Sequence, residues 1–134
     1  MKAEKTSDKI GRAILGAFLA ALLMKIFLFD FMIAEGNSML PAINPGAVLL
    51  VNKLSYGLKF PLAGSYIIRW AKPKKGDIVI FYTPRGELAV KRCAGLISGT
   101  LFLAYGDNGM VSLDSHFYGP VPVDNIVGQV LGIK

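Results

Sequence analysis

The feature that most limits how this chain can fold is a long apolar run near its N-terminus. No residue from Ala13 to Met24 is charged, and after Lys25 the apolar run continues to Phe29. As an α-helix this run is roughly 25 Å long, close to the shortest helix that crosses a hydrocarbon core of about 30 Å. Lys25 is close enough to one end for its ammonium group to reach the interface. We therefore predict an uncleaved transmembrane anchor helix over residues 13–33.

Two other interpretations of the run are a cleaved signal peptide and the buried core helix of a soluble protein. The basic residues that precede it, Lys2, Lys5, Lys9 and Arg12, fit a signal peptide. However, the run exceeds the usual apolar region of about 7–15 residues, and no small-x-small cleavage site follows promptly. Hydrophobic residues make up 53% of the chain, against about 45–50% in typical soluble domains. This surplus is more than a small core needs and favours the anchor.

Charge around the run predicts the orientation of the anchor. The basic residues of segment 1–12 are opposed only by Glu4 and Asp8, and positively charged flanks tend to stay in the cytoplasm. We expect a single-pass protein of the cytoplasmic (inner) membrane, with a basic cytoplasmic N-terminus over residues 1–12 and an extracytoplasmic domain over residues 34–134. The net charge of +6 also suits nucleic acid or an acidic substrate. Because much of it flanks the span, we predict no nucleic-acid partner.

The remainder of the chain has the pattern of one β-rich domain. Short apolar runs bounded by turn residues predict strands over residues 47–52, 66–70, 77–82, 87–94, 100–105 and 126–133. No later segment shows a capped helical stripe, so turns and loops connect these strands. The predicted fold class is mainly β, an antiparallel sheet or barrel-like module with one N-terminal transmembrane helix. The single cysteine, Cys93, excludes an intramolecular disulfide framework.

The Pro- and Gly-rich stretch over residues 56–75 leaves two interpretations open. Its basic residues, Lys59, Arg69, Lys72, Lys74 and Lys75, form either a solvated face or a contact with anionic lipid headgroups. Its large apolar residues, Phe60, Leu62 and Trp70, fit either the membrane interface or the core.

Ser38 is the first candidate nucleophile, in the sequence EGNSMLPAINPG. Gly36 before it and two prolines after it force turns, which would hold the serine on a bend with backbone N–H groups nearby for an oxyanion. A serine in such a turn is more often only a turn former. It needs a base, and the candidates are Lys91 and the single histidine, His116.

Strand alternation places Lys91 on one face with Ala89 and Cys93, where burial would lower the lysine pKa and favour a neutral amine. The pattern alone favours exposed charges on an edge strand instead. Short polar side chains crowd the segment that follows, at Asp107, Asn108, Ser112, Asp114 and Ser115. They predict either turns or a hydrogen-bonded scaffold that orients a catalytic amine.

Together these blocks resemble bacterial type I signal peptidases of peptidase family S26, membrane-anchored serine proteases with a Ser/Lys dyad. The resemblance rests on the anchor and, in order, on GNSMLPAI, GDIVIF, VKRCAG, and GDN followed by SLDSHFYGPVP. It implies Ser38 as nucleophile and Lys91 as general base. It also implies that Ser112 hydrogen-bonds the lysine and that Asp107, Asn108 and Asp114 support the site.

This sequence departs from the family at two of these positions. His116 stands where the family usually has an arginine paired with the aspartate at 114, which makes that pair weak or pH-dependent. Gly36 stands where some members have a hydroxyl-bearing residue at the oxyanion hole, so the hole would depend on the Ser38 N–H.

The resemblance further implies a substrate that binds extended against residues 32–36 and 88–90, with Ile33, Met39, Leu88 and Val90 in contact, and is cut after a small-x-small motif. The implied partners are signal peptides of exported preproteins, the phospholipid bilayer and a secretion translocon, with the chain a monomer that needs no cofactor or metal. Two alternatives are a pilin-processing peptidase of a conjugation system and a noncatalytic membrane-anchored paralogue.

Overall fold

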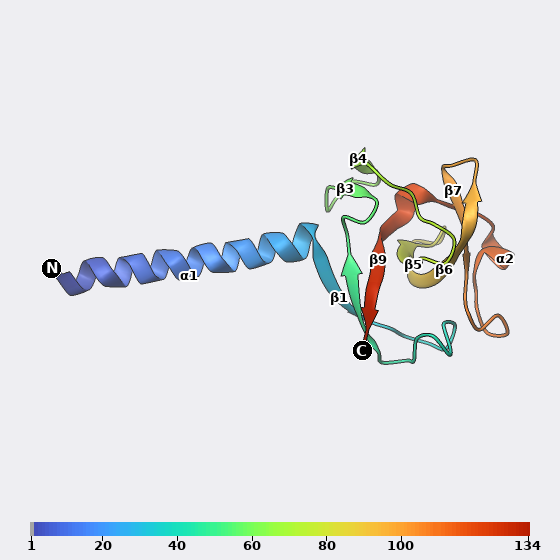
Figure 1. Ribbon diagram of the computed structural model, residues 1–134, viewed down its shortest axis with the longest axis horizontal. Coiled ribbons are helices and arrows are strands. Elements are labelled where there is room, and N and C mark those ends of the chain that lie inside the picture. Colours follow the sequence, from blue (N-terminus) through green and yellow to red (C-terminus); the bar gives the residue numbers. More distant parts are fainter. Residues whose placement is uncertain (1) are drawn as a thin grey trace.

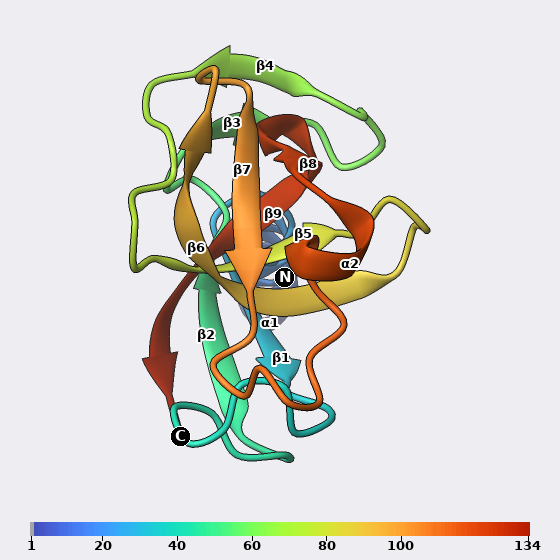
Figure 2. The ribbon, with the colours of Figure 1, turned by 90° about the vertical axis from the view of Figure 1, so that its right-hand side faces the viewer.

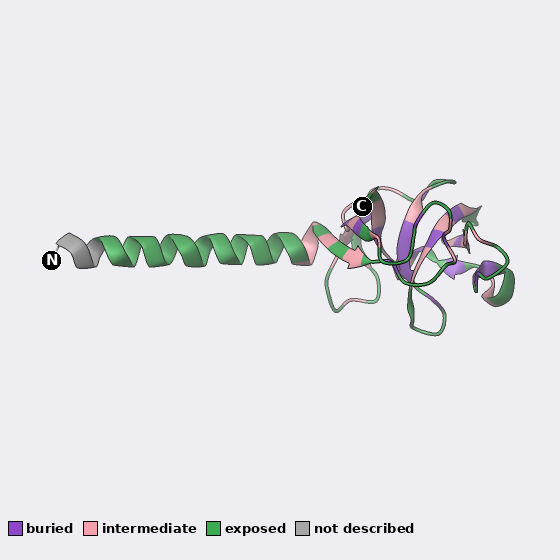
Figure 3. Cartoon of the chain, turned by 90° about the horizontal axis from the view of Figure 1, so that it is seen from below, coloured by how far each residue is buried: buried purple, intermediate pink, exposed green. Residues whose placement is uncertain are grey.

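The computed structural model describes residues 2–134, with side chains from residue 6 onward, as one long helix attached to a curled β-sheet (Figure 1). The predicted cytoplasmic segment 1–12 therefore falls partly outside the described residues. Helix α1 (Lys2–Phe27) projects away from the sheet, and its side chains are exposed along nearly its whole length (Figure 3). Its stretch Thr6–Phe27 has a mean hydropathy of 1.9 and is long and apolar enough to cross a membrane. Within the described residues none of this stretch is buried, whereas the core helix of a soluble protein is mostly buried.

Helix α1 does not cover the range 13–33 that was predicted for the anchor helix. It begins earlier and ends at Phe27, and residues Phe29–Ile33 form strand β1, which pairs with strand β2 (Val48–Asn52). Apolar content alone does not separate a helix from a strand in a short segment, and the sequence FDFMI is rich in residues that favour strands. The backbone groups of this segment are therefore satisfied by a sheet and not by a longer helix.

Lys53, just beyond β2, holds the end of the helix. Its ammonium group donates to the carbonyl oxygens of Lys25 at 3.1 Å and Ile26 at 3.4 Å, and lies 3.2 Å from the Asp30 carboxylate. The last carbonyls of a helix have no partner within the helix, and a cation there also suits the helix dipole. These contacts fix where the anchor leaves the β domain.

The main sheet has seven strands in the order β1-β2-β9-β5-β6-β7-β8, and every neighbouring pair is antiparallel. Figure 2 shows the sheet curled on itself like a half-barrel. The other elements are β3 (Gly57–Lys59), β4 (Tyr66–Arg69), β5 (Ile78–Tyr82), β6 (Leu88–Ile97), β7 (Leu101–Tyr105), α2 (Ser115–Tyr118), β8 (Val121–Pro122), a 3₁₀ turn η1 (Val123–Asn125) and β9 (Ile126–Ile133). Strands β3 and β4 pair separately as a two-stranded sheet. The predicted mainly β fold is confirmed.

Two apolar clusters form the core, and they lie on opposite faces of β5, because Val79 and Phe81 belong to one and Ile80 to the other. One is centred on Phe81 and Phe102, whose rings meet edge to face with centroids 5.3 Å apart. The other contains Met39 and Ile43 and packs against the neighbouring strands. This second cluster anchors the long connection between β1 and β2, which carries Ser38.

The basic residues of the stretch 56–75 fall into two groups, one bound within the domain and one exposed. Lys59 and Arg69 are engaged within the domain, because the first donates to the Asp124 carbonyl at 2.6 Å and the second pairs with the Asp124 carboxylate. The remaining lysines, Lys72, Lys74 and Lys75, are exposed. Phe60, Leu62 and Trp70 are 52%, 94% and 56% exposed, so none of them is a core residue. The Phe60 ring contacts the Phe27 ring at the end of α1, with centroids 6.2 Å apart.

Candidate active site

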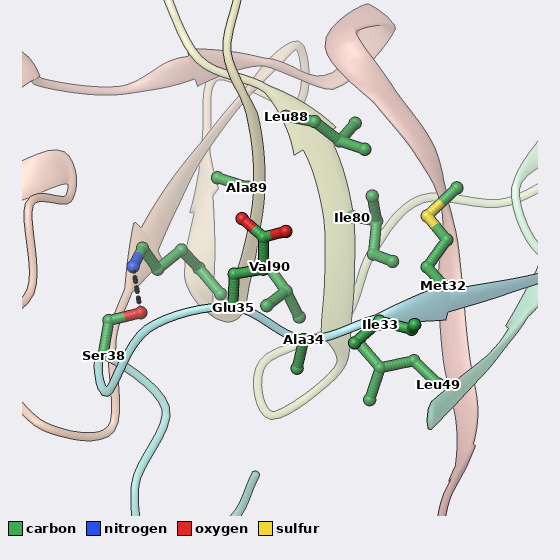
Figure 4. Close-up of a pocket in the computed structure, with 11 residues that line it drawn as sticks. Met32, Ile33, Ala34, Glu35, Ser38, Leu49, Ile80, Leu88, Ala89 and Val90 are labelled. Atoms are coloured by element: carbon green, nitrogen blue, oxygen red, sulfur yellow. Dashed lines mark hydrogen bonds between the residues drawn. The ribbon is translucent and has the colours of Figure 1, made fainter. Parts of the chain in front are cut away.

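Ser38 and Lys91 meet although 53 positions separate them in the chain. Ser38 lies in the turn that follows β1, and Lys91 lies in β6. The Lys91 ammonium donates a hydrogen bond of 2.6 Å to the Ser38 hydroxyl oxygen (Figure 4). The distance is within the reach that a general base needs to take a proton from a nucleophile.

Lys91 is buried although its part of β6 has one open backbone edge. Strand β5 pairs with β6 along Leu88–Arg92, and β7 pairs with it only from Arg92 onward. The interpretation of Lys91 as an exposed charge is wrong. Only 5% of Lys91 is exposed. Burial lowers the pKa of Lys91, although the negative charge of Asp114 opposes this shift. The lowered pKa favours the neutral amine, the form that can accept a proton.

The turn that carries Ser38 is held by core packing and by hydrogen bonds from Asn108. Met39, next to Ser38, is buried in the second apolar cluster. The backbone N–H of Asn108 donates to the Ser38 carbonyl at 2.9 Å, and the Asn108 side-chain amide donates to the Asn37 carbonyl at 3.2 Å. Gly36 has a φ of 75°, a left-handed conformation that glycine adopts without strain.

Gly106 is required by the close approach of two chain segments. A Cβ atom at this position would lie 2.1 Å from Ser112 Oγ and 2.6 Å from the Ser38 carbonyl oxygen. Ser112 is 3% exposed, and among the described residues no hydrogen bond joins its hydroxyl to Lys91. The hydrogen bond to the lysine that the resemblance implies for Ser112 is therefore not formed. Ser112 instead packs against Gly106, at the back of the nucleophile turn.

Asp114 organises the loop behind the site. Its carboxylate accepts hydrogen bonds from the backbone N–H groups of Gly106 at 2.9 Å and His116 at 3.0 Å, and it lies 2.8 Å from His116 Nδ1. Burial would raise the pKa of Asp114, but these bonds and the nearby Ser112 hydroxyl outweigh it and lower the pKa to about 2. The carboxylate is thus ionised and electrostatically coupled to Lys91. The His116 ring also stacks on Tyr105, with centroids 3.9 Å apart.

Asp107 acts on the strand that carries the lysine. Its carboxylate forms a two-pronged pair with Arg92, at 2.8 Å from Nε and 2.6 Å from Nη2, and Arg92 also donates to the Gly76 carbonyl at 2.9 Å. The hydrogen bonds that Arg92 donates to Asp107 raise the pKa of Arg92. The structure thus places Asp107 beside Arg92, on the face of β6 opposite Lys91.

A cleft of about 350 Å³ opens beside the Ser38–Lys91 pair. The lining residues are Met32, Ile33, Ala34, Glu35, Ser38, Leu49, Ile80, Leu88, Ala89, Val90 and Lys91. Three predicted substrate contacts, Ile33, Leu88 and Val90, are among them. The fourth, Met39, is only 2% exposed and belongs to the core, because its side chain points away from the cleft into the cluster that supports the turn.

Sequence reasoning missed Leu49 and Ile80 as cleft residues. Both lie in strands that were predicted. Leu49 alternates with more exposed neighbours, whereas Ile80 lies between the buried residues Val79 and Phe81, so the sequence pattern does not separate cleft from core at these positions. Within the described residues, no group of three or more His, Cys, Asp or Glu side chains is placed to hold a metal ion.

Residues 7–101 match the family described as "Signal peptidase, peptidase S26". The chain belongs to this family. Signal peptidase I of Haemophilus influenzae is 34% identical over 107 residues, which is 80% of this chain and 29% of that protein. Signal peptidase I of Buchnera aphidicola from Acyrthosiphon pisum is 39% identical over 81 residues, 59% of this chain and 26% of that protein. Signal peptidase I of Pseudomonas fluorescens is 33% identical over 88 residues, which is 64% of this chain and 31% of that protein. This signal peptidase family member thus spans less than a third of the length of these curated relatives.

Proposed function

We propose that this chain is a signal peptidase I, a serine endopeptidase that removes signal peptides from exported preproteins. The observation that carries the proposal is the 2.6 Å contact between the buried Lys91 amine and the Ser38 hydroxyl. Membership of the S26 family supports the same conclusion. The assigned roles are nucleophile for Ser38 and general base for Lys91.

The reaction proceeds through an acyl-enzyme. Neutral Lys91 takes the proton of the Ser38 hydroxyl while Ser38 Oγ attacks the carbonyl carbon of the scissile bond. The resulting ammonium then protonates the leaving amine, and Lys91 serves again as base when water hydrolyses the ester. Among the described residues the Ser38 N–H has no acceptor, so it is free to donate to the oxyanion. Gly36 provides the sharp turn before this N–H and contributes no side-chain donor.

The substrate binds as an added strand in the cleft. Strand β1 is the outermost strand of the sheet, and the first residues of β6 pair with β5 alone, because β7 pairs with β6 only from Arg92 onward. Two open backbone edges therefore border the cleft, which is the arrangement that binds an extended peptide. Eight of the eleven lining residues have apolar side chains, and the limited volume of the cleft suits small side chains next to the scissile bond.

The membrane positions enzyme and substrate together. Helix α1 anchors the chain in the cytoplasmic membrane with its N-terminus in the cytoplasm, and the β domain lies on the outer side. Phe60 and Leu62 are exposed beside the end of α1 and enter the interface there. Because a signal peptide is itself held in the bilayer, sharing one surface raises the effective concentration of the two partners. The chain acts as a monomer, and a translocon delivers the preprotein.

The first test is cleavage of a membrane-embedded preprotein by the full chain in detergent, with the cut site identified by mass spectrometry. Ser38→Ala and Lys91→Ala should each abolish cleavage, whereas Ser65→Ala and Lys75→Ala, at exposed positions outside the cleft, should not. His116→Ala should retain activity. Normal cleavage by Lys91→Ala together with a dead His116→Ala would show that the base is misassigned. Cleavage of a pilin precursor alone, or of nothing, would favour one of the two alternatives.

A further inference from the structure

The cleft contains one acidic side chain that the proposed mechanism does not use. Glu35 and Lys91 are the only charged residues among those that line it. Figure 4 shows the Glu35 carboxylate projecting into the cleft beside Val90. Glu35 is exposed, and among the described residues its side chain has no hydrogen bond or ion pair. Its charge is therefore available to whatever occupies the cleft.

The backbone pattern of β1 shows how a bound peptide would lie against Glu35. Leu28 and Ala34 exchange hydrogen bonds with the β2 side, through contacts with Lys53, Ala47 and Gly46 of 2.8 to 2.9 Å. Hydrogen-bonding direction alternates along an antiparallel strand. The N–H and carbonyl groups of Ile33 and Glu35 therefore point to the opposite, open edge. An added strand would bond to these two residues.

Side-chain alternation then decides which substrate residue meets the carboxylate. Ala34 is 5% exposed and faces the core, whereas its neighbours Ile33 and Glu35 are exposed. Residues opposite one another on paired strands share a face of the sheet. If the two small residues of the proposed small-x-small motif take the space beside Ala34 in the cleft, the middle residue lies on the same side as Ile33 and Glu35. Since Glu35 is the outward residue nearer to Ser38, it is the neighbour of that middle residue.

We propose that Glu35 is a specificity-determining residue that favours lysine or arginine at the middle position of the cleavage motif and disfavours aspartate or glutamate there. This inference rests on the proposed function. Glu35 does not act through the base, because the charge that influences Lys91 is that of Asp114. Its effect is on substrate selection.

The test compares three preproteins that differ only in the middle residue, which is lysine, glutamine or glutamate. For the full-length wild type, kcat/KM for lysine should exceed that for glutamate by about threefold to tenfold, since attraction and repulsion at an exposed pair each contribute up to about fivefold. High salt should reduce this ratio, because the Debye length falls to about 3 Å at 1 M. Glu35→Gln should bring the ratio close to one, and Glu35→Lys should reverse it.

Glu87→Gln is the matched control, because Glu87 is exposed and does not line the cleft. It should leave both the activity and the lysine-to-glutamate ratio unchanged. Each variant is judged by the ratio, so a uniform loss of activity does not affect the result. A ratio near one in the wild type, or a ratio that survives Glu35→Gln, would overturn the inference while the proposed function stands. If no preprotein is cleaved by the wild type, both fail.

Discussion

Gly106→Ala tests how the loop behind the site supports the nucleophile. The added Cβ would lie 2.1 Å from Ser112 Oγ, 2.5 Å from Ser112 Cβ and 2.6 Å from the Ser38 carbonyl oxygen. All three are far inside van der Waals contact, and two of the three atoms belong to groups with little freedom to move. Overpacking of this kind costs about 1–3 kcal/mol. In a domain of this size, about 1 kcal/mol lowers Tm by roughly 4–8 °C.

The effect on activity should be larger than the effect on stability. If the Ser38 carbonyl moves away from the new methyl group, Ser38 Oγ moves relative to Lys91. A displacement of about 1 Å at a reacting atom costs on the order of 100-fold in rate. The assays are thermal unfolding of the full chain in detergent and kcat for a test preprotein. We expect a Tm loss of at least about 4 °C and a kcat loss on the order of 100-fold.

Two further variants separate crowding from a general effect of alanine. Gly109→Ala is the matched control, because a Cβ there would meet no atom within 4 Å and the residue has no positive φ. Ser112→Gly combined with Gly106→Ala removes the clash with Ser112 but keeps that with Ser38, so it should restore Tm more than kcat. A wild-type kcat for Gly106→Ala would refute the argument that this close approach positions Ser38.

Three other predictions follow from single contacts. Lys91→Met should abolish cleavage yet raise Tm at neutral pH, because protonating a buried amine with a lowered pKa costs stability. In the wild type, the free energy of unfolding and kcat should both rise as the pH rises through the lowered pKa of Lys91. A flat pH profile of either quantity would contradict this prediction. Asp107→Asn should lower the unfolding free energy by about 1 kcal/mol in a thermal melt, because it weakens a partly exposed pair with Arg92. Arg92→Ala should cause a similar loss, and an unchanged melt for Asp107→Asn would contradict the prediction. Leu62→Ser should reduce cleavage of a preprotein in vesicles but not of a short soluble peptide, and equal losses on both would exclude a role at the interface.

Much of the fold could be predicted from local pattern. All six predicted strand segments contain an observed strand, because β-branched runs between turn residues are a strong local signal. The strands that were missed lack it. β3 and β8 are three and two residues long, and β1 directly continues the apolar anchor, so its period could not be distinguished from that of the helix. What separates β1 from α1 is its pairing with β2, a contact between segments distant in sequence.

The candidate site was harder to predict from local sequence pattern, because it also depends on contacts between segments that are distant in sequence. Alternation correctly placed Lys91 on a face with Cys93, but it could not show whether that face was covered. Coverage depends on β6 lying between β5 and β7 and on the curl of the sheet. Met39 shows the converse error, since its place beside Ser38 suggested a substrate contact whereas its side chain supports the turn from inside. Ser112 and Gly106 could be understood only as a pair, from their close approach.

Strand β1 connects helix α1 to the sheet and also lines the cleft that contains Lys91. A buried amine is unfavourable on its own. The strand that carries Lys91 is held by β5 along Leu88–Arg92, by β7 along Arg92–Ile97, and by the cluster around Phe81 and Phe102. The earlier part of β6 is left unpaired toward the cleft, opposite β1, which is the strand that continues directly from α1. The strand that follows α1 is thus also one wall of the cleft. In the function that we propose, a peptide leaving the bilayer beside α1 can therefore follow β1 to Ser38 without crossing the rest of the domain.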